Sequence, residues 1–105
     1  MALGMIEVYG FATSIVVADK MAKTADVEIV AIDKNKPANA ESVEVPLVMV
    51  VKCEGDVAAV EAAVAAGIAE AESRNLYITS KIISRQSEDM EWFAHMTATG
   101  KDKLR

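Results

Sequence analysis

The stretch from Ala2 to Asp33 restricts the fold more strongly than any other part of the chain. It opens with a short run of apolar and strand-forming residues between two glycines. A helical segment follows, in which apolar residues recur at spacings of three and four: Ile15, Ala18, Met21, Ala22 and Ala25. Residues 27–33 then have the composition of a strand. The stretch predicts a β-α-β unit whose helix is N-capped by Thr13 or Ser14, with a surface pair between Asp19 and Lys23.

The same order of patterns returns in the second half of the chain. Residues 47–53 predict a strand, and the helix after them begins at Gly55-Asp56. The apolar positions of that helix are regularly spaced: Val57, Val60, Val64, Ile68 and Ala71. Arg74 and Asn75 end it, since Asn tolerates a left-handed backbone. Residues 76–84 predict a fourth strand, and a short helix capped by Ser87 follows.

This order, β-α-β-β-α-β plus a short C-terminal helix, predicts an α+β fold of the ferredoxin-like type. We expect a four-stranded antiparallel sheet with the two main helices covering one face. The other face needs cover from the last helix or from a neighbouring subunit. The 105 residues suffice for one domain spanning 1–105. Only 5% of them are aromatic, so the core is modest and assembly would add burial.

Charge and composition argue against several function classes. The net charge is −5 and no basic run exists, which predicts no nucleic-acid partner. No segment is long and apolar enough for a membrane helix, and the N-terminus does not resemble a signal peptide. A single cysteine cannot form an internal disulfide, so a cytoplasmic location is expected.

Few residues suggest chemistry. Cys53 and His95, the only cysteine and the only histidine, lie in different predicted elements without metal-ligand spacing. We interpret Cys53 as a buried residue at the end of a core strand, and His95 as a packing or partly exposed residue of the short helix. Trp92 is expected to cover the sheet edge. No nucleophile and base are paired, so we predict no enzyme, no cofactor and no metal.

One long irregular stretch lies between the second and third predicted strands, from Lys34 to Pro46. Pro37 lacks an N–H and Asn39 favours turns, so neither continues a sheet comfortably. Long loops in small domains are usually functional or disordered. This loop is therefore the candidate for the function particular to this chain.

Four motifs together resemble the bacterial microcompartment shell proteins of the single-domain, hexamer-forming type. They are ALGMIE at 2–7, ADKMAK at 18–23, GDVAAV at 55–60 and ISR at 83–85. The resemblance covers about four-fifths of the chain. It implies a homohexamer, a flat tile that packs with other shell proteins into the shell of a cytoplasmic microcompartment. That shell encloses enzymes, and small metabolites pass through a central pore of each tile.

The resemblance also assigns roles to residues. It places Lys23 and Arg85 at the contact between neighbouring hexamers. It places the turn between the second and third strands at the pore, and here that turn contains Lys34, Asn35, Lys36, Pro37, Ala38, Asn39, Ala40, Glu41 and Ser42.

The chain also departs from the family pattern. The family turn is short and rich in glycine, whereas residues 35–46 contain no glycine. Residues 84–87 read Ser-Arg-Gln-Ser where the family usually has Pro-Arg-Pro-His. The alternative hypothesis is a ferredoxin-like regulatory domain that binds a small molecule under the 35–46 loop, because this fold carries many functions.

Overall fold

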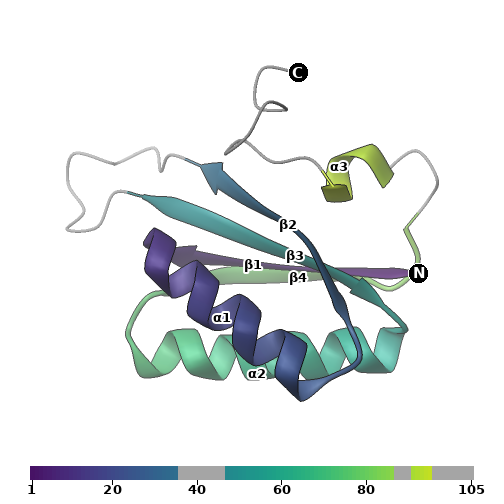
Figure 1. Ribbon diagram of the computed structural model, residues 1–105, viewed down its shortest axis with the longest axis horizontal. Helices are drawn as coiled ribbons and strands as arrows, with labels where there is room; N and C mark the ends of the chain where they lie inside the picture. The colour runs from purple at the N-terminus through teal and green to yellow at the C-terminus, as the bar shows by residue number, and fades with distance from the viewer. Residues whose placement is uncertain (36–46, 87–90, 96–105) are drawn as a thin grey trace.

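The computed structural model describes residues 1–35, 47–86 and 91–95 (Figure 1). Its elements are β1 (Ala2–Tyr9), α1 (Phe11–Thr24), β2 (Glu28–Asn35), β3 (Val48–Gly55), α2 (Val57–Ser73), β4 (Tyr77–Ile83) and α3 (Glu91–His95). The predicted order β-α-β-β-α-β with a short last helix is confirmed, and so is the α+β fold.

The four strands form one antiparallel sheet in the order β2-β3-β1-β4. In its centre, Met5 on β1 lies opposite Lys52 on β3 and Lys81 on β4. Helices α1 and α2 lie side by side against one face of the sheet, and α3 lies apart from them over β2 and β3 (Figure 1). This confirms the expectation that the last helix partly covers the second face.

The main core lies between the sheet and the helix pair. It consists of small and medium side chains such as Ile6, Val51 and Met21, all fully buried. Gly67 allows α2 to approach the sheet closely, because a Cβ at this position would lie 2.5 Å from Ile6 Cδ1 and 3.0 Å from Met21 Cγ. A core of small and medium side chains is compatible with this close approach of the helix to the sheet.

The predicted start of α1 is wrong. The helix begins at Phe11 directly after Gly10, which has a φ of 92° and no side-chain cap. Thr13 and Ser14 therefore lie inside the first turn, where the Ser14 hydroxyl donates to the Phe11 carbonyl at 2.5 Å. The buried face follows this earlier start: Thr13, Ser14, Val17, Ala18 and Met21.

The predicted apolar stripe of α1 is correspondingly wrong at two positions. Ile15 is 45% exposed, and Ala22 is also exposed. Small polar side chains near the N-terminus of the helix take the buried places instead, which periodicity of apolar residues alone does not reveal.

Helix α2 agrees better with its prediction. Val60, Val64 and Ala71 are buried, whereas Val57, at the first position of the helix, is 39% exposed. Asn75 adopts a φ of 59° just after the helix, as expected for a left-handed C-terminal residue. Among the helices of the described residues, none has the length and apolarity needed to cross a membrane.

Candidate functional site

The sheet has two ends, and the residues of interest divide between them. One end holds the start of β1 and the ends of β3 and β4, since Ala2 lies opposite Gly55 and Leu3 opposite Ile83. The other end holds the last residue of β2 and the first of β3, because Asn35 lies opposite Val48. Antiparallel pairing therefore separates the two groups of predicted site residues by the length of the strands.

The two predicted edge residues, Lys23 and Arg85, belong to the first end. Lys23 lies in the last turn of α1, just before β2 begins opposite Glu54. Its ammonium is 2.8 Å from Asp19 Oδ2, and both side chains are largely exposed, which confirms the predicted surface pair. Arg85 follows β4 and is also exposed. Both cations are accessible within one chain, and their role between tiles stays a prediction.

The predicted pore residues belong to the opposite end. Lys34 and Asn35 are the last two residues of β2, and Lys34 is exposed. The Lys34 amide donates to Asp33 Oδ1 at 2.8 Å. The other predicted pore residues, 36–42, lie outside the described residues. Their role also stays a prediction.

A polar cluster that the sequence did not identify lies where α3 meets the sheet. Lys52 is only 1% exposed. Its ammonium donates to the Phe93 carbonyl at 2.8 Å and lies 4.1 Å from the centre of the Phe93 ring. Asp33 Oδ2 is 3.7 Å away. Burial lowers the pKa of Lys52, and the charge and hydrogen bond of Asp33 oppose that shift.

Glu54, two residues further along β3, forms the second half of this cluster. It is 8% exposed and accepts a hydrogen bond from the Gln86 side-chain amide. Its other oxygen lies 3.2 Å from Nε2 of His95, which is half exposed. The prediction of a packing, partly exposed His95 is confirmed. Lys52 is a charged residue inside the apolar run 47–53, which marks its position as unusual. The periodicity of the sequence could not identify α3 as the partner of Lys52 or of Glu54.

Cys53 points to the opposite face from Lys52 and Glu54, into the main core. It is fully buried, which confirms the prediction. Burial raises the pKa of its thiol to about 11. A thiol with this pKa stays protonated at neutral pH and is a poor nucleophile. Within the described part of the chain, no three His, Cys, Asp or Glu side chains are grouped so that they could hold a metal ion.

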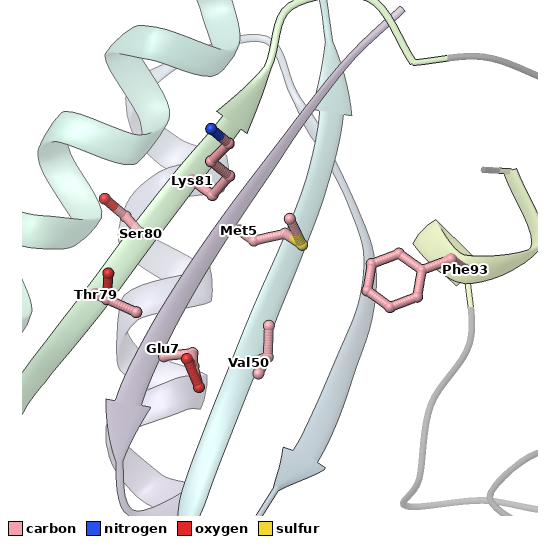
Figure 2. Close-up of a pocket in the computed structure, with 7 residues that line it drawn as sticks. All are labelled: Met5, Glu7, Val50, Thr79, Ser80, Lys81 and Phe93. Carbon is pink, nitrogen blue, oxygen red and sulfur yellow. The ribbon is translucent and has the colours of Figure 1, made fainter.

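An open groove of about 450 Å³ lies beside α3, on the face of the sheet opposite α1 and α2 (Figure 2). Seven residues line it: Met5, Glu7, Val50, Thr79, Ser80, Lys81 and Phe93. Phe93 extends from α3 and faces Met5 across β3 (Figure 2). The expectation that Trp92 covers the sheet is wrong, because Trp92 is 66% exposed and meets Phe93 edge-on. Phe93 takes that position instead, and its neighbour Ala94 is fully buried.

Comparison with known proteins gives a consistent result. Residues 2–86 match the model of the BMC domain. The chain is 37% identical over 87 residues to the bacterial microcompartment shell protein PduK of Citrobacter freundii, covering 83% of this chain and 51% of that protein. It is 37% identical over 91 residues to the shell protein EutK of Salmonella typhimurium, covering 87% and 50%. The chain thus spans about half the length of the curated relatives it matches.

The fold is also similar to a solved structure. A crystal structure of a microcompartment protein from Desulfitobacterium hafniense has a TM-score of 0.71 and 33% sequence identity, and the match covers 86% of this chain and 46% of that one. Sequence and fold therefore indicate the same family independently of any single motif.

Proposed function

The chain belongs to the BMC domain family of bacterial microcompartment shell proteins, and we propose that six copies form a tile of such a shell. The observation that carries this proposal is the extent of the match, since residues 2–86 include β1 through β4 and both main helices. The named relatives are shell proteins. A shell role agrees with a sequence in which no nucleophile and base are paired, and the relatives named above support it rather than a regulatory domain.

The arrangement of the sheet supports a division of roles within the proposed tile. Lys23 and Arg85 lie at one end of the sheet and Lys34 and Asn35 at the other. Residues at opposite ends can serve opposite boundaries of a subunit, one toward the neighbouring tile and one toward the central axis. We therefore propose Lys23 and Arg85 as contacts between tiles and residues 34–42 as the lining of the pore.

The proposed mechanism at the pore is passive. Groups that line a pore select what crosses it through size, charge and hydrogen bonding. Six copies of residues 34–42 would bring Lys34, Lys36 and Glu41 around one axis, together with Pro37 and uncharged polar groups. Such a lining favours small polar metabolites over large or apolar ones. The enzymes inside the compartment and the other shell proteins would be the chain's partners.

The edge assignment is tested by reversing the charge of Lys23. In Lys23→Glu the exposed pair with Asp19 is lost and a like-charge pair replaces it, which costs the helix only a few tenths of a kcal/mol. We expect Lys23→Glu to form hexamers but no extended sheets under the electron microscope, in conditions in which the unsubstituted protein should form them. The matched control is Lys20→Glu, an equal charge change at another exposed position of α1, which should leave sheets intact. Sheets that persist unchanged in Lys23→Glu would exclude Lys23 as an edge contact.

A further inference from the structure

Helix α3 packs on the molecule outside its main core. Ala94 is fully buried, yet the core cluster is built from β1, β3, α1 and α2 on the opposite face of the sheet. Side chains of a strand alternate between faces, so Lys52 and Glu54 point toward α3 whereas Val51 and Cys53 point into the core. The contacts that hold α3 are thus separate from those that hold the sheet to α1 and α2.

The central contact of α3 is a lysine that α3 itself helps to bury. Lys52 is 1% exposed, and both the carbonyl and the ring of Phe93 are within reach of its ammonium. A buried ammonium is costly unless it is paired and hydrogen-bonded, and α3 supplies a hydrogen bond and an aromatic face. If α3 lifted, water would reach Lys52 from the same side. In the open state the Lys52 ammonium is therefore hydrated, so opening does not leave it buried without the contacts of α3.

A second contact lies further along β3. Glu54 is shared between His95 of α3 and Gln86, which follows β4. The Gln86 backbone amide also donates to the Met1 carbonyl at 3.2 Å. Gln86 is thus fixed to the body of the domain by its backbone and by its side chain. Gln86 is therefore an anchored point, and α3 contacts β3 through Lys52 and Glu54.

From these contacts we infer that α3 is a separable strap. In this inference the Lys52–Phe93 contact holds α3 against β2 and β3, and breaking it lifts α3 while the main core stays folded. Lifting exposes Lys52, Glu54 and Asp33 and removes Phe93 from the side of the groove. The face of the sheet opposite α1 and α2 then changes from a partly apolar groove to an open charged surface. The inference does not rest on the proposed shell function, since every contact lies within one chain.

Local opening of this kind is expected for elements with few buried apolar contacts. The strap has five residues, of which Trp92 is exposed and Phe93 is half buried. Its attachment depends on side-chain contacts to β3 rather than on backbone pairing with the sheet. Loss of one charge-assisted contact is therefore sufficient to shift the equilibrium toward the open form.

Limited proteolysis of the full chain with chymotrypsin tests the inference. Cleavage after Trp92 requires α3 to unfold locally, and cleavage after Tyr77 requires the sheet to open. In Lys52→Thr, which keeps a strand-forming residue but cannot reach Phe93, we expect cleavage after Trp92 to accelerate by about tenfold or more. Cleavage after Tyr77 should stay unchanged. The matched control is Lys81→Thr, the same substitution at an exposed position of β4 on the same face, which should not accelerate cleavage after Trp92.

A reciprocal experiment substitutes a residue of the strap, which contributes no side chain to the main core cluster. Lys52 should react with an amine-acetylating reagent far more slowly than exposed Lys20 and Lys23. Phe93→Ala should increase the Lys52 rate by about tenfold or more and leave the other two rates unchanged. The strap is refuted if Lys52→Thr leaves cleavage after Trp92 unchanged, if sites after Trp92 and Tyr77 accelerate together, or if Phe93→Ala leaves Lys52 protected.

Discussion

The close approach of α2 to the sheet gives a sharp test of the packing at Gly67. In Gly67→Ala two effects oppose each other. Alanine favours a helix interior over glycine by about 1 kcal/mol. Against this, the new Cβ would lie 2.5 Å from Ile6 Cδ1, closer than real Cβ contacts allow, and at tight distances of 3.0 and 3.1 Å from Cγ and Sδ of Met21.

The magnitude follows from which atoms must move. Ile6 and Met21 are both fully buried, so their side chains cannot move into solvent, although Ile6 Cδ1 is the end of its side chain. Overpacking of this kind costs about 1–3 kcal/mol. After subtraction of the helix-propensity gain, we expect Gly67→Ala to lower the free energy of unfolding by up to about 2 kcal/mol.

The assay is denaturant unfolding followed by circular dichroism at one fixed protein concentration, because assembly makes apparent stability depend on concentration. Ala65→Gly, on the exposed side of the same helix, is the matched control and measures the propensity effect alone, with an expected loss of about 1 kcal/mol. If Gly67→Ala instead gained stability by as much as Ala65→Gly lost it, α2 would not pack against Ile6 and Met21 as described.

Two further predictions concern the core thiol and the loop. Burial raises the pKa of Cys53 from 9.0 to about 11, so the folded state holds the thiol proton more tightly than the unfolded state. The stability that this proton contributes, about 3 kcal/mol, is therefore lost as the pH rises from 9 toward 11. Cys53→Ala should reduce this decline in the free energy of unfolding, and an identical decline in both proteins would contradict the burial of the thiol. Deletion of residues 39–42 should keep the hexamer and change the conductance of reconstituted tiles for small ions, whereas loss of the hexamer would place the loop in the subunit interface instead.

Much of the fold could be predicted from residue patterns. The element order and the end of α2 followed from periodicity and from Asn75, whose left-handed backbone the structure contains. The start of α1 could not be predicted, because the turn at Gly10 replaces a side-chain cap. Thr13 and Ser14 suit an N-cap by residue type, but they also fit a tightly packed helix face, and only the packing decides between the two.

The polar cluster under α3 shows a different limit of sequence reasoning. The apolar run 47–53 contains Lys52, and a local pattern cannot say whether this charge faces solvent or a partner. Its partner Phe93 is 41 residues away, in an element too short to have a clear helical pattern. Trp92 was the more prominent aromatic residue by size, but the side of α3 that carries Phe93 and Ala94 is the side that packs.

The central claim is that six copies of this chain form one tile. The most direct measurement is the mass of the purified protein by light scattering coupled to size exclusion, over a range of concentrations. We expect a species of six times 11.2 kDa, with larger sheets forming as the concentration rises. A monomer or a trimer that persists at the highest concentration would contradict it.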